Sequence, residues 1–477
     1  MVFALLSLIL PFAFSYLFIS GSINQSIFGR RWARVLLTVL LAAGLALGGT
    51  SCLFFLWLVM VGGPAVTYER FEQVLFGILT LTWLIFWRPA QLATGKSFPA
   101  SATVCRGLNL VLFLVFCYIV ATRLVRFVFL SLNNPFGEVD AIYIWTLRAR
   151  LLFSGGDYWR ELFNQIVFPG STGGYPLLLP STIARFWTYW GEDSQIVPAA
   201  VACFFTFAII GLGLAALTIL RARSQGLLAG IVLAGTSFLI AHGATQYADV
   251  PLAFYFMATF VCCALYDKAE VRKPSLLILA GLMAGLAAWT KNEGGLFVLV
   301  VVLARLVVLV PFHGWQIALR QLLTFSAGLA PFALFLLFFK TQIALAMTPI
   351  LSQGWSAIFA KLLNASSYME VGRAIVGKMF RVGHPGLTLF VVYWWFVGRA
   401  PKRNHISLAG TLAIAVPLMF SGYCFIFIIT PFISVAYQLA TSLDRLWLHL
   451  WPSAVLFFFL WVRTPEEAID QVNPCEK

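Results

Sequence analysis

The side chains best suited to chemistry in this chain are two aspartates that flank long apolar runs. Asp140 lies beyond the run 104–132, and Asp249 lies where the run 250–266 begins. A carboxylate at a membrane–water boundary is partly desolvated, which makes it a stronger general base. Each aspartate also fits a helix start, where it caps free backbone N–H groups. The residues alone leave both interpretations open. Glu138 is either a second acid or a solvated one.

Basic side chains stand at similar boundaries. Lys291, Asn292 and Glu293 form a turn between two apolar runs, where a Lys–Glu pair either marks the water boundary or binds an anion. Asp444 and Arg445 open the last run, and a guanidinium suits a two-point contact with phosphate. His384 precedes a proline between two later runs. Together these residues fit a reaction on a substrate that carries a lipid tail and a phosphate.

The elements that position these residues are predicted to be membrane-spanning helices. Hydrophobic residues make up 61% of the 477 and charged residues 10%, with a mean hydropathy of +0.90. Soluble domains carry about 25% charged residues, so the chain is predicted to be an all-α integral membrane protein. About thirteen apolar runs suit helices that cross a bilayer, at 2–20, 35–62, 74–87, 104–132, 196–220, 226–241, 250–266, 274–289, 294–311, 317–340, 385–398, 406–430 and 447–462.

Lysines and arginines in the short loops predict the orientation of these helices. The basic loops fall on one side if the amino terminus is outside, as the positive-inside rule requires. The net charge of +14 therefore indicates topology and does not indicate a nucleic-acid partner. Five polar clusters then fall on the external face, namely 133–180, 241–249, 291–293, 341–384 and 444–445.

Three regions follow from this pattern. Residues 1–103 are predicted to be accessory transmembrane helices, and 104–340 a core with a large external catalytic loop at 133–180. In this loop the stretch IYIWTLRARLLF, directly after Ala141, predicts a helix that lies on the membrane. Residues 341–477 are predicted to hold external amphipathic helices and the last transmembrane helices.

Four ordered segments of the chain resemble the GT-C membrane glycosyltransferases of bacteria, relatives of the dolichyl-phosphate-mannose–protein mannosyltransferases and the aminoarabinose transferases. These segments are VDAIYIWTLRARLLF with the downstream YPLLLP, then YADVPLAFY, GLAAWTKNEG and ATSLDRLWLHLWP. They span roughly 104–462. The chain departs from the family pattern at Val139, where a Trp is expected, and at Arg148, where a Lys is expected. The FIIT-PFISVAYQL segment also lacks an expected acid and histidine.

The resemblance implies a GT-C fold, a polyprenyl-phosphate-linked sugar as donor, and an acceptor that is a glycan, a lipid or a protein. It implies that Asp140 is the general base of an inverting transfer, with Lys291 or Arg445 at the donor phosphate. Aromatic rings would stack on sugar faces. The predicted catalytic residues are Asp140 and Asp249, and the predicted substrate-binding residues are Glu138, Trp145, Arg148, Tyr175, Lys291, Glu293, His384 and Arg445.

No cofactor is required by this prediction, although Glu138 and Asp140 are a candidate pair for a divalent cation. The resemblance places the protein in the bacterial inner membrane, with its site facing the exterior. Two alternatives remain open: a lipid or solute transporter, and a ligase or polymerase that moves a whole glycan from a diphosphate lipid. In a third, structural interpretation, both aspartates are only helix caps.

Overall fold

The computed structural model describes residues 2–26, 30–62, 65–86, 103–164, 174–269, 272–344, 353–382, 384–400, 406–430 and 434–472. These residues are almost entirely helical, and the β structure among them is one isolated bridge between Arg399 and Val462. The prediction of an all-α membrane protein is thereby confirmed at the level of its helices.

The described residues in the first half of the chain form helices of different lengths. They are α1 (Val2–Ser26), α2 (Arg31–Met60), α3 (Ala65–Phe86), α4 (Thr103–Asn133), η1 (Ala141–Thr146), α5 (Leu147–Ser154), η2 (Gly156–Phe163), α6 (Leu178–Trp190), α7 (Ile196–Leu220), α8 (Arg223–Gly235) and α9 (Ser237–Ala244).

The second half continues with α10 (Asp249–Lys268), α11 (Pro274–Thr290), α12 (Asn292–His313), α13 (Trp315–Phe338), η4 (Phe339–Ile343), α15 (Trp355–Leu362), α16 (Ala365–Val382), α17 (His384–Val397), α18 (Ile406–Ile429), α19 (Val435–Trp461) and α20 (Pro465–Val472). Residues 141–154 are helical, as predicted, and so are most of 355–382.

Within the described residues, nine helices are long and apolar enough to span a membrane: α1, α2, α4, α7, α10, α12, α13, α18 and α19. The pair α8–α9, bent by 56°, forms a tenth span if it crosses as one unit. The remaining three of the thirteen apolar runs lie on α3, α11 and α17, which do not meet the same length, hydropathy and charge limits.

Helix α10 is the centre of the fold. Its candidate membrane-spanning stretch is entirely buried within the protein, and it packs against α7, α11, α18 and α19. A helix that is apolar on every side is found either in a protein core or in a bilayer, and α10 is enclosed by other helices. Asp249 is the first residue of this helix, so the fold places one carboxylate at the end of its most enclosed element.

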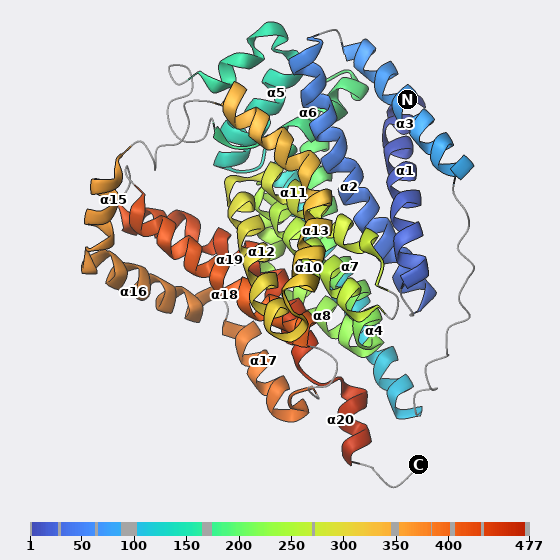
Figure 1. Ribbon diagram of the computed structural model, residues 1–477, viewed down its shortest axis with the longest axis vertical. Coiled ribbons are helices and arrows are strands. Elements are labelled where there is room, and N and C mark those ends of the chain that lie inside the picture. The colour runs from blue at the N-terminus through green and yellow to red at the C-terminus, as the bar shows by residue number, and fades with distance from the viewer. Residues whose placement is uncertain are drawn as a thin grey trace.

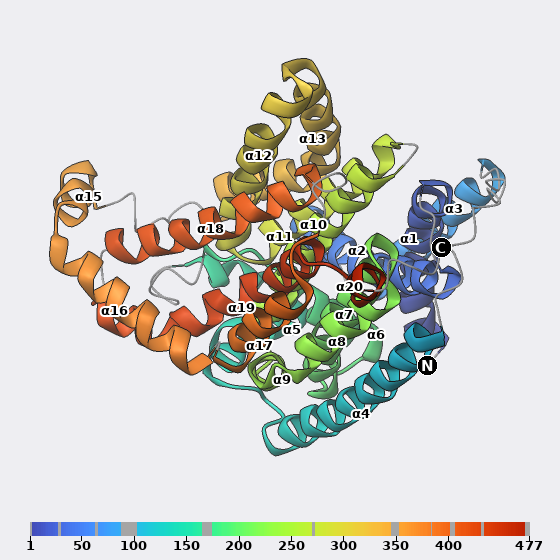
Figure 2. The ribbon, with the colours of Figure 1, turned by 90° about the horizontal axis from the view of Figure 1, so that it is seen from below.

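Peripheral helices surround this centre. Helices α15 and α16 lie on the opposite side of the molecule from α1 and α3, as both views show (Figures 1 and 2). Along the longest axis, α5 lies at one end and α17 and α20 lie at the other (Figure 1). Helices α11 and α13 approach closely at Gly281 and Gly328, where an added Cβ would lie about 2 Å from a backbone oxygen of the facing helix. Small residues allow such close packing of membrane helices.

Candidate functional site

Asp249 is the residue around which the candidate site is built. Its side chain is fully buried, and both carboxylate oxygens have partners. Lys291 Nζ lies 2.8 Å and His449 Nε2 lies 2.6 Å from Oδ1. Arg445 Nε lies 3.0 Å and His242 Nε2 lies 3.4 Å from Oδ2. A buried carboxylate is tolerated only when it is paired and hydrogen-bonded, and this one has four partners from three parts of the chain.

Arg445 connects Asp249 to Asp140. Its Nη1 donates to Asp140 Oδ2 at 2.6 Å, and its guanidinium lies over the ring of Tyr247, 4.8 Å from the centroid. The Asp140 side chain is 25% exposed, so it reaches solvent while Asp249 does not. Asp140 makes no side-chain capping hydrogen bond. The capping interpretation of Asp140 is therefore wrong, because its carboxylate binds an arginine and not the free backbone N–H groups.

Asp140 is held in place by the docking of residues 134–140 on the segment between α9 and α10. The backbone N–H of Asp140 donates to the Tyr247 hydroxyl at 3.3 Å, and Gln246 Nε2 donates to the Pro135 carbonyl at 3.1 Å. Gly137 has a φ of +71°, and a Cβ there would lie 2.5 Å from the Thr245 carbonyl oxygen. Only glycine fits this position without displacing the backbone.

Helix η1, which begins directly after Asp140, is a π-helix. π-Helical turns are rare in proteins overall, but those that occur are often at functional sites. The extra residue in the turn changes the direction in which the neighbouring side chains point. A second π-helix, η4, carries Lys340. Its amine donates to Asn292 Oδ1 at 2.8 Å and also to the Gly174 carbonyl. Lys340 therefore ties the start of α12 to the residue before Tyr175.

Lys291 is the single residue between α11 and α12, and its backbone is extended. The tight turn needs Gly294, because a Cβ there would lie 1.9 Å from the Ala287 carbonyl oxygen. Lys291 Nζ also lies 3.1 Å from Glu293 Oε1. Burial by itself lowers the pKa of Lys291, but the carboxylates of Asp249 and Glu293 outweigh burial and raise that pKa above its usual value. The amine is therefore a permanent cation beside Asp249.

Arg445 and His449 lie one turn apart on the same face of α19, which is the spacing that brings two side chains together. This helix begins at Val435 and is capped by the Ser434 hydroxyl. The prediction that Asp444 and Arg445 open the last span is therefore wrong. Polar residues on one face lower the local hydropathy, but the helix continues through them because that face points into the protein and not into lipid.

Tyr175, Trp145 and Arg148 extend the cluster around Asp249, since Tyr175 contacts Lys291 and the other two contact Tyr175. The Tyr175 ring centroid lies 5.8 Å from Lys291 Nζ and 5.7 Å from the ring of Trp145. Arg148 is buried, and its Nη1 donates to the Tyr175 carbonyl at 3.5 Å. Burial lowers the pKa of Arg148 to about 10, which leaves it cationic at neutral pH.

Eight of the residues predicted from the sequence are joined by these contacts: Asp140, Trp145, Arg148, Tyr175, Asp249, Lys291, Glu293 and Arg445. Glu138 is exposed, and its backbone N–H donates to the Thr245 carbonyl at 3.3 Å. His384 begins α17, and its side chain lies outside the described part of the structure.

Four further residues of the cluster, His242, Tyr247, Lys340 and His449, were not predicted. His449 had a signal in the sequence, because it lies four residues after Arg445 on a predicted helix. His242 and Tyr247 stand in the same short segment as Asp249. Lys340 lies at the end of a long apolar run and gives no local signal.

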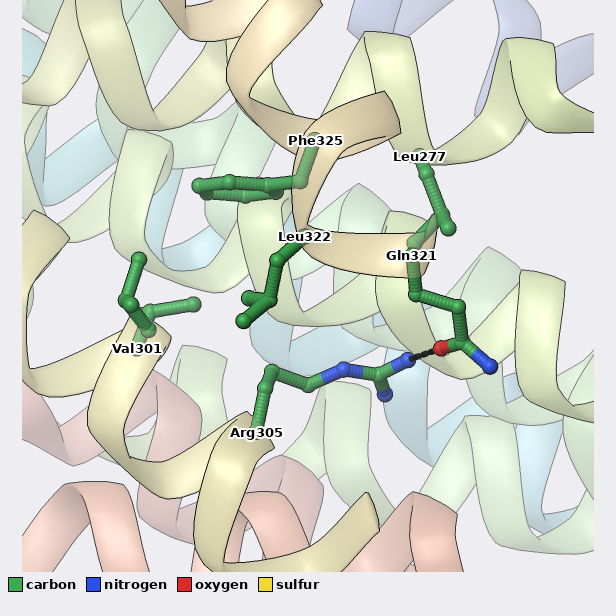
Figure 3. Close-up of a pocket in the computed structure, with 7 residues that line it drawn as sticks. Leu277, Val301, Arg305, Gln321, Leu322 and Phe325 are labelled. Atoms are coloured by element: carbon green, nitrogen blue, oxygen red, sulfur yellow. Dashed lines mark hydrogen bonds between the residues drawn. The ribbon is translucent and has the colours of Figure 1, made fainter. Parts of the chain in front are cut away.

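No metal site accompanies this cluster in the residues that the structure describes. They contain no group of three or more His, Cys, Asp or Glu side chains that could hold a metal ion. A small cavity lies between α11, α12 and α13, beside Arg305, Gln321 and Phe325 (Figure 3). Arg305 is already paired there, with Asp267 at 2.6 Å and with Gln321 at 2.6 Å, so this cavity lies beside a structural ion pair between α10 and α12.

Comparison with protein-family models, with curated proteins and with solved structures finds no match to this chain.

Proposed function

We propose that this protein is a membrane glycosyltransferase that moves a sugar from a polyprenyl-phosphate donor to an acceptor hydroxyl at the external face of a bacterial inner membrane. The observation that carries the proposal is the chain of contacts Asp140–Arg445–Asp249–Lys291. It joins one solvent-reaching carboxylate to two cations at one place. The proposed fold is of the GT-C type, in keeping with the four segments that resemble that group.

In the proposed reaction Asp140 is the general base. Its carboxylate takes the proton of the acceptor hydroxyl, the hydroxyl oxygen bonds to the anomeric carbon, and the bond from that carbon to the phosphate oxygen breaks. A single displacement of this kind inverts the anomeric configuration. Polyprenyl phosphate leaves with the bonding electrons, and cations placed at the phosphate stabilise the charge that develops on it.

Arg445 is the cation proposed to contact the phosphate, whereas the buried Lys291 contributes its positive charge without touching the substrate. A guanidinium has five N–H donors. Arg445 donates one to Asp249 and one to Asp140, so other N–H groups remain to donate to a phosphate. Tyr175 offers an aromatic face next to Lys291 for the sugar, and the buried Trp145 packs against the Tyr175 ring. Asp249 was predicted to be catalytic. We instead propose a positioning role, because its side chain is fully buried and its oxygens already accept from four partners.

The test is sugar transfer by purified full-length protein, given radiolabelled polyprenyl-phosphate sugars and membrane acceptors. We expect wild-type turnover and, for Asp140→Asn, a loss of about 100-fold or more, as removal of a general base costs. The matched control is Asp193→Asn, which breaks an exposed Asp–Arg pair with Arg150 at 3.0 Å and should leave turnover unchanged.

Two outcomes contradict the proposal. An Asp140→Asn protein as active as wild type removes the base assignment. Movement of the donor lipid across the membrane without sugar transfer identifies a transporter, the alternative that the sequence leaves open.

A further inference from the structure

At Asp249 Oδ1, the oxygen that Arg445 does not contact, two residues form a second chain of hydrogen bonds. Tyr423 of α18 places its hydroxyl 3.2 Å from His449 Nδ1, and His449 Nε2 lies 2.6 Å from Asp249 Oδ1. His449 is fully buried, and Tyr423 is 2% exposed. Neither side chain reaches solvent, so neither touches a substrate that arrives from outside.

The chemistry of the three groups fixes where the protons lie. An ionised carboxylate only accepts hydrogen bonds, so His449 Nε2 must carry a hydrogen to bond Asp249. In a neutral imidazole the other nitrogen is then an acceptor, and the Tyr423 hydroxyl supplies the donor that it needs. The Asp249 carboxylate is already paired with Lys291 and Arg445, so its charge does not offset the desolvation of a third, fully buried cation on the imidazole.

We propose that Tyr423 and His449 are positioning residues that fix the Asp249 carboxylate, and through it Arg445 and Asp140. Tyr423 holds His449 as the Nε2–H tautomer. That N–H and Lys291 share Oδ1, which sets the rotation of the carboxylate and aims Oδ2 at Arg445 Nε. Arg445 then presents Nη1 to Asp140. The effect of Tyr423 and His449 on sugar transfer rests on the proposed function. The assignment of the Nε2–H tautomer to His449 does not rest on it.

The tautomer is measured by nitrogen NMR of full-length protein labelled with ¹⁵N-histidine in lipid bilayers. The chain has five histidines, and the His449 signals are those lost in His449→Gln. We expect a protonated Nε2 and an unprotonated Nδ1 in wild type, and partial conversion to the Nδ1–H form in Tyr423→Phe. An imidazolium, or an Nδ1–H tautomer in wild type, overturns the proposal.

A pair of substitutions tests the consequence for sugar transfer. The amide nitrogen of Gln can take the place of His Nε2 and donate to Asp249, whereas the shorter Asn side chain reaches only the place of Nδ1. We expect His449→Gln to stay within about 10-fold of wild-type kcat and His449→Asn to lose about 100-fold, the range typical of outer partners that orient functional side chains. Equal activity of the two variants, whether high or low, overturns the positioning role.

The variant Tyr423→Phe tests the positioning role if both His449 variants fail to fold. It removes a single hydroxyl and keeps the ring, so it disturbs the packing of the helices least. We expect its kcat to fall about 10-fold with KM for the donor unchanged, and an unchanged kcat overturns the role. If wild type transfers no sugar, the proposed function fails, and the NMR measurement still decides the tautomer.

Discussion

At the scale of single residues, the two candidate acids differ in their surroundings. Asp249 is fully buried with four partners, while Asp140 is 25% exposed with one charged partner. Breaking a buried ion pair leaves an uncompensated charge and is costly, whereas a pair near solvent contributes little. The same chemical change should therefore have different effects at the two positions.

We predict that Asp249→Asn lowers the free energy of unfolding by about 3 kcal/mol, because it leaves Lys291 and Arg445 facing a neutral amide. Asp140→Asn should cost under about 1 kcal/mol. Thermal unfolding of the two variants in the same detergent checks this. The double variant Asp249→Asn/Lys291→Met should recover part of the loss, and equal melting temperatures for the two single variants would contradict the assignment of roles.

At the scale of elements, a second buried ion pair fixes the amino-terminal helices to the rest. Glu72 of α3 accepts from Arg185 of α6 at 2.8 Å through both oxygens. The hydroxyls of Tyr68 and Tyr189 donate to the same carboxylate, at 2.7 Å and 2.6 Å. Arg185 also donates to the Ser7 carbonyl of α1 at 2.6 Å. The cluster thus joins three elements and is well separated in sequence from the candidate site.

We predict that Glu72→Gln lowers the melting temperature while KM for the donor stays unchanged. The amide cannot balance the buried Arg185 charge, which costs about 3 kcal/mol. The matched control is Glu69→Gln, one turn earlier on α3, whose side chain makes no hydrogen bond within the described residues. Thermal unfolding and donor titration of both variants are the measurements. A large change in KM with unchanged stability would show that α3 serves the site directly.

At the scale of the whole molecule, the charged clusters occupy the two ends of the central helices. Asp249 begins α10 and Asp267 lies near its end, where Arg305 of α12 binds it. A twenty-residue helix is about 30 Å long, so the ends of α10 lie roughly one bilayer core apart. The candidate site therefore lies at one end of the bundle, with the Asp267–Arg305 pair at the other.

We predict that the two ends face opposite sides of the membrane. Glu138 and Arg272 are both exposed and flank opposite ends of α10. In a background without native cysteines, Glu138→Cys should react with an impermeant maleimide added to intact cells, and Arg272→Cys only after permeabilisation. The basic loops give the expected orientation. Labelling in the reverse pattern would place the candidate site on the cytoplasmic side.

The sequence by itself determined the helices and most of the members of the candidate site. Length and hydropathy are local properties, so thirteen apolar runs correspond to helices in the structure. Loop polarity is local as well, and described residues from four of the five predicted polar clusters do meet around Asp249, namely Asp140, Tyr175, His242, Lys291 and Arg445. The prediction failed at the start of α19, because hydropathy does not distinguish a polar face that points inward from the end of a helix.

Only the tertiary structure decided which side chain binds which. Arg445 and Asp140 are 305 residues apart in the chain, and no spacing rule connects them. The structure also separates the two acids by burial, which depends on the helices packed around α10. His449 contacts both Asp249 and Tyr423 because α18 and α19 pack against each other and against α10. Since these contacts depend on how the helices cross, the residues that hold the site in place appear only in the folded molecule.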